Sequence, residues 1–202
     1  MALYITSAQF KTYAGIATSS TTHDATITAS ITAASRAVDG WCGRQFAPNT
    51  STTESRVYDA RWGHRVDVDD FSTTTGLTVK TDEGDNGTYD QTWTVTTDFT
   101  VEPANLNLNG IPWTYTQIRA VGSKVFPTAG QRARVQVTAA FGWPAVPDAV
   151  TQATYELALD IFKMKDAPFG VAGFNEYGQI RVRENNTVKM LLEPYRKHGL
   201  VL

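Results

Sequence analysis

Two amphipathic helical patterns lie far apart in this chain, and a long stretch with the alternation of β-strands separates them. The first pattern repeats at intervals of three and four residues, at Ile27, Ile31, Ala34, Val38 and Trp41. The second repeats in the same way, at Val150, Ala153, Leu157, Ile161 and Met164. Such spacing places apolar side chains on one face of a helix. Because threonines lower the helix propensity of the first segment, we expect the two apolar faces to pack against each other.

Cap residues predict where the helices begin and end. Thr6 or Ser7 can start a short helix that runs to Ala14, and Asp24 and Asp148 are candidate N-caps of the two long helices. A further helix is predicted over residues 188–192, before a proline. Both ends of the chain are therefore expected to be helical.

The middle of the chain alternates apolar and polar residues with a period of two, as at Val66 and Val68 or Val135 and Val137. Turn sequences separate these runs, at residues 85–87, 109–110 and 129–130. We predict about six short strands in an antiparallel sheet, folded as a small sandwich or a barrel-like module.

The order of helix, sheet and helix predicts an α+β protein. We expect a helical core built from residues 1–49 and 144–202, with a β-rich module, residues 50–143, inserted between its halves.

Composition excludes several classes of protein. A formal net charge of −2 argues against a protein that coats nucleic acid, since such proteins neutralise phosphates with clustered cations. The single Cys42 excludes an internal disulfide, and its place beside Trp41 on a predicted helix favours a buried structural thiol. No signal peptide precedes the first helix and no apolar run could span a bilayer, so we expect no membrane association.

Candidate chemical groups are sparse. His64 with Asp67, Asp69 and Asp70 is the nearest approach to a metal cluster, but the acids alternate with valines and suit a solvated strand edge better. His23, His64 and His198 are the available bases, and no serine lies in a nucleophile elbow. We therefore predict no enzyme activity, no catalytic residue, no metal and no cofactor.

Two apolar segments near the C-terminus suggest contacts with other chains. The glycine-containing loop of residues 169–174 carries Phe169, Val171 and Phe174, which either cover their own core or contact a neighbouring subunit. The chain then ends in a mixed cationic and apolar tail, which either frays or docks on a partner.

Residues 33–46, AASRAVDGWCGRQF, resemble a helix of the head–tail connector proteins, also called head-to-tail adaptors, of tailed double-stranded-DNA bacteriophages. The opening segment, residues 4–16, is similar to the first helix of that family. Residues 146–170 and 191–196 are similar to the closing half of its longer members. The resemblance covers the two helical zones and leaves the middle sheet outside.

The resemblance implies a structural virion protein without chemistry of its own. By this resemblance it would assemble in the host cytoplasm as a ring of twelve copies beneath the portal protein of the neck. The ring would extend the DNA channel without gripping DNA and would offer a docking surface to the next connector or tail protein. The resemblance assigns the portal contact to the tail, namely Tyr195, Arg196, Lys197, Leu200 and Leu202.

Two other functions stay open at this stage. The chain could be a stopper or tail-completion protein of the same neck. Alternatively, the β-rich module could bind a carbohydrate or a host surface, with Trp62, Trp93 or Trp113 as stacking platforms.

Overall fold

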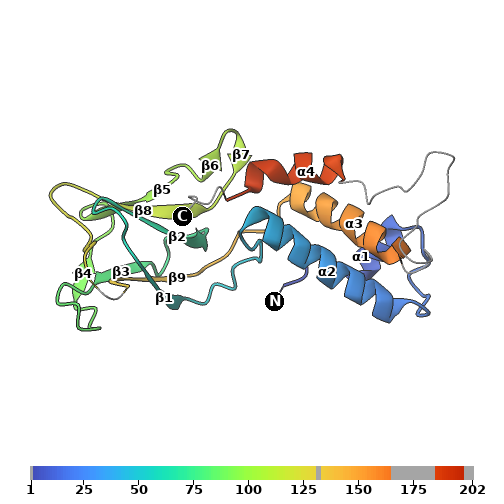
Figure 1. The fold of residues 1–202 in the computed structure, drawn as a ribbon, viewed down its shortest axis with the longest axis horizontal. Helices are drawn as coiled ribbons and strands as arrows, with labels where there is room; N and C mark the ends of the chain where they lie inside the picture. The colour runs from blue at the N-terminus through green and yellow to red at the C-terminus, as the bar shows by residue number, and fades with distance from the viewer. Residues whose placement is uncertain (1, 131–132, 165–184, 198–202) are drawn as a thin grey trace. The chain divides into compact units, whose positions relative to one another are not determined.

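The computed structural model describes residues 2–130, 133–164 and 185–197 (Figure 1). Contacts divide the chain into two compact units, a helical unit of residues 1–47 and 146–202 and a β unit of residues 48–145. These boundaries lie close to those expected at 49–50 and 143–144. The described residues contain helices and antiparallel strands, which confirms the α+β class.

The helical unit is built from segments at both ends of the sequence. Its described helices are α1 (Ser7–Tyr13), α2 (Asp24–Cys42), α3 (Asp148–Lys163) and α4 (Asn186–Leu192), followed by the 3₁₀ turn η3 (Glu193–Tyr195). The first two come from the N-terminal segment and the others from the C-terminal segment, so the unit closes across the insertion.

Local chemistry explains most helix starts. Thr6 and Gln9 form a capping box at α1, with the Gln9 amide donating to Thr6 Oγ1 over 3.2 Å. Asp24 and Asp148 are not N-caps, contrary to the prediction, because each is the first residue of its helix. Acidic residues are favourable there too, since they face the positive end of the helix dipole.

The core of the helical unit confirms the predicted packing of α2 against α3. Its buried members come from the segment before α1 and from α1, α2 and α3: Ile5, Phe10, Ile27, Ile31, Ala34, Ala158 and Phe162. Phe10 meets Phe162 edge to face, with ring centroids 5.6 Å apart. Two predicted members of the stripes are exposed instead, since Trp41 is 37% and Met164 51% accessible. The buried faces pass instead through Cys42, one residue after Trp41, and through Phe162, two residues before Met164.

The β unit is richer than predicted, with nine strands instead of six among the described residues. They are β1 (Glu54–Tyr58), β2 (Arg65–Phe71), β3 (Thr78–Thr81), β4 (Gln91–Trp93), β5 (Phe99–Glu102), β6 (Asn107–Leu108), β7 (Ile111–Pro112), β8 (Tyr115–Ala120) and β9 (Val135–Ala139). All pairs of named strands are antiparallel, and they form three sheets, β1-β9-β3-β4, β2-β8-β5 and β6-β7.

Two of the three predicted turns join neighbouring strands. The β6–β7 hairpin turns at Asn109 and Gly110, whose φ angles of 53° and 84° suit a two-residue connection. Asp85 and Gly87 also have positive φ, but they lie in a longer loop between β3 and β4. The strands β1, β6, β7 and β8 were not predicted, because polar residues break the alternation in β1 and β8 and because β6 and β7 are two residues long.

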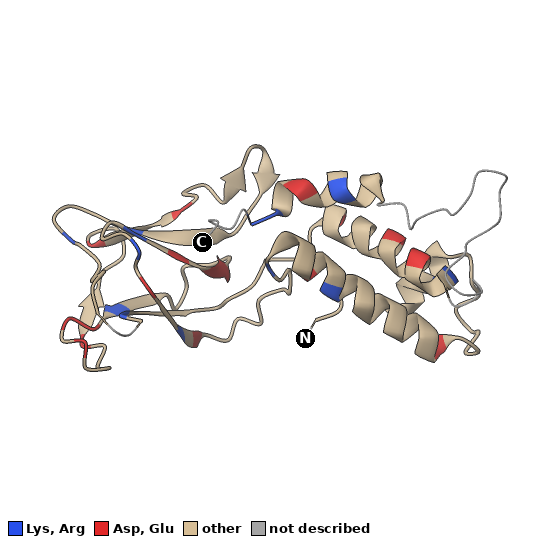
Figure 2. Ribbon diagram, viewed as in Figure 1, with Lys and Arg blue, Asp and Glu red and all other residues tan. Residues whose placement is uncertain are grey.

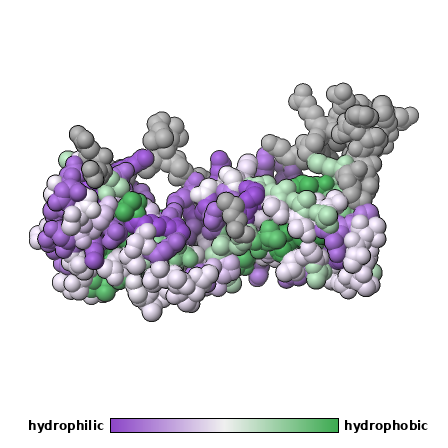
Figure 3. Space-filling model, turned by 90° about the horizontal axis from the view of Figure 1, so that it is seen from below, coloured by the Kyte–Doolittle hydropathy of each residue, from purple (hydrophilic) through white to green (hydrophobic). Residues whose placement is uncertain are grey.

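The two larger sheets share one core. Its buried members are Ala60, Val66, Val68, Phe71, Val79, Trp93, Phe99, Ile118, Phe126, Val135, Val137 and Ala139. Trp93 stacks on Phe126 with ring centroids 4.3 Å apart and planes 5° from parallel. Apolar side chains therefore hold each unit around a core of its own. On the face shown in Figure 3, hydrophilic side chains dominate the β unit and apolar ones gather over the helical unit.

Candidate assembly surfaces

The start of the C-terminal tail is held by the helical unit. Tyr195 is 7% exposed and meets Phe46 edge to face at 5.8 Å, and Phe46 meets Tyr4 at 5.9 Å in the same way. Burial raises the pKa of Tyr195, and the nearby charge of Asp148 raises it further. The Tyr195 side chain is thus an anchor in the core and offers little surface to a partner.

The next two residues of the tail lie against the C-terminal end of α2. The guanidinium carbon of Arg196 is 5.1 Å from the centre of a Trp41 ring, and Lys189 Nζ from α4 is 5.5 Å from it. The Lys197 amide donates to the Cys42 carbonyl over 2.7 Å, which satisfies one of the free carbonyls at that helix end. Both Arg196 and Lys197 are exposed, so their side chains can meet a partner.

Gly43 lies where the chain leaves α2. It ends α2 in the left-handed conformation, with φ of 63°, and its amide donates to the Asp39 carbonyl over 2.8 Å. A Cβ there would lie 3.5 Å from Lys197 Cβ. That distance is an ordinary van der Waals contact, so the left-handed backbone conformation, and not the space beside the tail, favours glycine here.

The other predicted contact residues lie outside the described residues. These are Leu200 and Leu202 of the tail, and Phe169, Val171 and Phe174 of the loop. Of the predicted portal-contact residues, the structure describes Tyr195, Arg196 and Lys197. Trp41, which was not predicted as a contact residue, lies near Arg196 and Lys189.

The N-terminus is tied to α2 by a buried polar network that the sequence did not indicate. The Tyr4 hydroxyl donates to Asp39, and it accepts the Phe46 amide over 2.9 Å. Arg36 forms an ion pair with Asp39 at 3.2 Å and donates to the Ala2 carbonyl over 2.7 Å. Burial raises the pKa values of Tyr4 and Asp39. Phe46, on which Tyr195 packs, is thus itself fixed by this network.

The thiol and histidines of the described chain show no catalytic arrangement. Cys42 is buried, as predicted, and burial raises the pKa of its thiol to about 12. His23 packs edge to face on Phe162 at 5.9 Å. His198 lies outside the described residues, within which no three His, Cys, Asp or Glu side chains are grouped to hold a metal.

Of the acids near His64, two are surface groups and one is not. Asp67 lies 3.8 Å from Arg65, and Asp69 Oδ2 accepts from Arg56 over 2.8 Å. Asp70 is buried and accepts from Thr114 Oγ1 at 3.0 Å and from the Trp143 indole at 3.4 Å. Asp70 therefore links β2 to distant segments, a structural role that the sequence analysis missed.

The tryptophans proposed as stacking platforms are mostly core residues. Trp93 and Trp113 are each 5% exposed, and Trp113 meets Trp143 edge to face at 5.3 Å. Trp62 is 39% exposed, with the Arg65 guanidinium 4.3 Å from its ring. Two of the three cannot stack on a sugar, which removes the main support for a carbohydrate-binding module.

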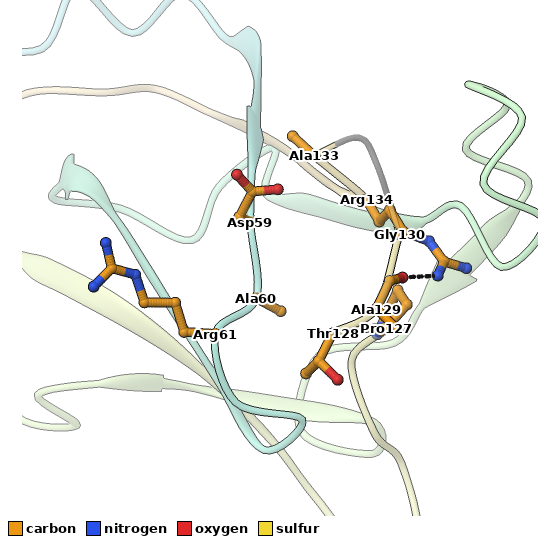
Figure 4. Close-up of a pocket in the computed structure, with 9 residues that line it drawn as sticks. All are labelled: Asp59, Ala60, Arg61, Pro127, Thr128, Ala129, Gly130, Ala133 and Arg134. Atoms are coloured by element: carbon orange, nitrogen blue, oxygen red, sulfur yellow. Dashed lines mark hydrogen bonds between the residues drawn. The ribbon is translucent and has the colours of Figure 1, made fainter.

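One hollow of about 310 Å³ lies in the β unit, between residues 59–61 and the segment before β9 (Figure 4). Arg134 borders it but is already engaged, donating to the carbonyls of Asp82 and Glu83 over 2.6 Å each and to that of Ala129. Arg61 points away from the hollow in Figure 4. With its cation occupied, the hollow has no evident means of holding an anion.

No helix within the described ranges is long and apolar enough to cross a membrane.

Neither a protein-family model nor a curated protein sequence matches this chain. Solved structures do match it along most of its length. A chain from the neck of an empty gene transfer agent particle, computed with C6 symmetry, aligns with a TM-score of 0.57 at 20% identity, over 100% of this chain and 95% of that one. A chain from the virion of the native particle aligns with a TM-score of 0.58 at 18% identity and the same coverage.

A third chain comes from the neck of the native particle computed with C12 symmetry. It aligns with a TM-score of 0.51 at 18% identity, over 88% of this chain and 85% of that one. At such identities the likeness establishes the fold. The two units together have the fold of chains found in the neck and virion of a gene transfer agent.

Proposed function

We propose that this chain is a structural protein of the neck of a phage-like particle, a head-to-tail adaptor that forms a ring beneath the portal. The observation that carries the proposal is the fold match to chains from the neck and virion of a gene transfer agent, which extends over both units and not over the helical unit alone. Those necks were computed with C6 and C12 symmetry, which fits a ring of identical subunits. We propose twelve copies in this ring.

The ring extends the DNA channel and offers a docking surface to the next neck or tail protein. A formal net charge of −2 suits a bore through which DNA passes without being bound at its phosphates. In this proposal the protein is made and assembled in the host cytoplasm, and it performs no reaction.

The portal contact is assigned to the tail, with different roles for its residues. Tyr195 fixes the start of the tail in the helical core, while Arg196 and Lys197 present their charges at the surface. Leu200 and Leu202 supply the apolar contact. The loop residues Phe169, Val171 and Phe174 are proposed to contact the neighbouring subunit.

Electron microscopy of the purified chain mixed with the portal of its own particle tests this function. A ring stacked on the portal is the expected result, and chains that never associate with the portal would contradict it. Deleting residues 198–202 should abolish the association while preserving the fold. The deletion must stop there, because removing Tyr195 would also remove a buried side chain from Phe46.

A further inference from the structure

The edges of the two larger sheets of the β unit differ. In the sheet β2-β8-β5, segments of the same chain bridge to both outer strands. Phe141 forms a bridge with Phe71 of β2, and another joins Val95 to Phe99 of β5. In the sheet β1-β9-β3-β4, the outer strands β1 and β4 make backbone hydrogen bonds only to β9 and β3 within the described residues. Each therefore presents a row of amides and carbonyls with which another strand can pair.

The strands β1 and β4 lack several features that block pairing at a sheet edge. Neither contains a proline, a lysine or a bulge, and the register of each with its neighbour runs without a shift. The cation of β1 is neutralised locally, because Arg56 pairs with Asp69 at 2.8 Å and with Glu54. The next side chain, Val57, points to the opposite face of the sheet and is 50% exposed. The β1 edge is therefore open to a strand and carries an apolar contact.

The strand directions make these two edges complementary to each other. Every pair in this sheet is antiparallel, so β1 and β3 run one way and β9 and β4 run the other. Within one chain the two edges are three strand spacings apart, roughly 14 Å. A rotation about an axis parallel to the strands keeps their directions, so β4 of one copy lies antiparallel to β1 of the next. Such a contact joins unlike edges of identical chains, as a ring requires.

Two exposed charges favour the same pairing. Arg61 lies three residues after β1, and Asp90 immediately precedes β4. Both are exposed and form no ion pair within the described residues. Arg61 points away from the segment before β9 (Figure 4), and the loop that leads to Asp90 is rich in acidic residues (Figure 2). Because the end of one strand lies beside the start of its antiparallel partner, the contact brings these opposite charges to the same end.

We propose that β1 of one copy pairs with β4 of the next copy, so that the sheets β1-β9-β3-β4 of neighbouring subunits join edge to edge. Main-chain hydrogen bonds hold this contact, and Arg61 of one copy pairs with Asp90 of the other. Val57 and Thr92 lie on the same face of the joined sheet, since their cross-strand partners Gln136 and Lys80 oppose each other. This pairing rests on the ring of the proposed function and adds the strands that join its subunits.

A charge placed on the β1 edge tests the pairing. Sedimentation velocity of the full chain over a concentration series would compare the native sequence with Val57→Lys, which should weaken self-association at least tenfold because a lysine blocks a sheet edge. Leu108→Lys is the matched control, since Leu108 is 41% exposed in the same unit but belongs to the β6–β7 hairpin. It should leave self-association unchanged.

Charge exchange tests which edges meet. Arg61→Asp and Asp90→Arg should each weaken self-association about fivefold, because each places like charges opposite each other. The two substitutions combined should restore the association of the native chain, since the charges then attract again.

Hydrogen exchange reports whether the main chain takes part. On association, the amides of residues 54–58 and 91–93 should gain protection, whereas those of β5, whose edge is already bridged, should not. A native chain that stays monomeric throughout the series, a Val57→Lys variant that associates as the native chain does, a charge exchange without rescue, or unchanged exchange in β1 and β4 would each overturn the pairing.

Portal binding of the same variants separates this pairing from the proposed function. If the charge exchange restores self-association but the native chain does not bind the portal, the adaptor role fails and the strand pairing stands. If the portal is bound while Val57→Lys and the charge reversals leave self-association unchanged, the strand pairing fails and the adaptor role stands.

Discussion

Two buried hydroxyls of the helical unit and one buried carboxylate of the β unit are satisfied in different ways. In the helical unit, Ser30 and Thr154 each donate to the carbonyl four residues earlier in the same helix, over 2.9 and 2.7 Å. In the β unit, Asp70 accepts from Thr114 and Trp143, which are 44 and 73 positions away. The hydroxyls of Ser30 and Thr154 therefore depend on local structure, whereas the carboxylate of Asp70 depends on the tertiary fold.

This difference determines how much a single substitution at each of these residues disrupts. Removing a helical hydroxyl takes away a bond within one turn, and alanine is itself a good helix former. Removing the Asp70 carboxylate leaves buried donors on other segments without their acceptor. Apolar packing, in contrast, should count equally in both units.

The largest effect is expected in the apolar core of the helical unit. Phe10→Ala should lower the free energy of unfolding by about 3–5 kcal/mol, because it removes a fully buried ring that packs on Phe162. Urea denaturation followed by circular dichroism at the helix band measures it. Leu3→Ala, at a side chain 45% exposed, is the control and should change stability by less than about 0.5 kcal/mol. Equal effects of the two substitutions would contradict the assigned core.

The next effect tests the long-range polar link of the β unit. Asp70→Ala should cost about 1–3 kcal/mol, since the Thr114 hydroxyl and Trp143 indole lose an acceptor inside the core. Tryptophan fluorescence reports it, because four of the five tryptophans belong to this unit. Asp67→Ala removes an exposed carboxylate from the same strand and should have little effect. A stable Asp70→Ala variant would show that the link is dispensable.

A pH-dependent effect is expected from Asp82, which is buried at the start of the β3–β4 loop. Burial alone would raise its pKa, but the amides of Gly87 and Asn86 and the charge of Arg134 outweigh burial and lower it. Because the folded pKa lies below the unfolded one, this stabilisation is present above about pH 4 and is lost as the pH falls through the folded pKa.

Asp82→Asn isolates this contribution, since it cannot ionise. Denaturation midpoints of the β unit should converge between the variant and the native chain as the pH is lowered from 6 to about 2. A constant difference over that range would mean that the ionised carboxylate does not hold the loop.

The same contrast explains what the sequence could predict. Periodicity identified α2 and α3 and their mutual packing, because a helical face is a local property. It could not choose between Trp41 and Cys42 as the end of the buried face, since both follow Val38 at helical spacing. Tertiary structure decides that choice: Cys42 is buried in the helical unit, whereas Trp41 lies at the surface beside Arg196.

For the candidate surfaces too, the sequence indicated local features but not contacts between distant segments. The cationic tail was evident from its composition, but the burial of Tyr195 depends on Phe46, which lies far away in the sequence. The link between Trp41 and Arg196 likewise joins opposite ends of the chain. In the β unit, the strands β1 and β8 and the role of Asp70 stayed hidden because pairing partners are not encoded locally.

The smallest effect on stability should come from a buried hydroxyl of the helical unit. It tests the comparison with Asp70 most directly. Ser30 is 3% exposed, as deeply buried as Asp70, yet its only described bond is to the Thr26 carbonyl. That carbonyl also accepts within the helix, and alanine gains helix propensity, so Ser30→Ala should change stability by less than about 0.5 kcal/mol. Urea denaturation beside Asp70→Ala gives the measurement. A loss as large as that of Asp70→Ala would mean that burial, and not the sequence distance of the partner, determines what a polar group contributes.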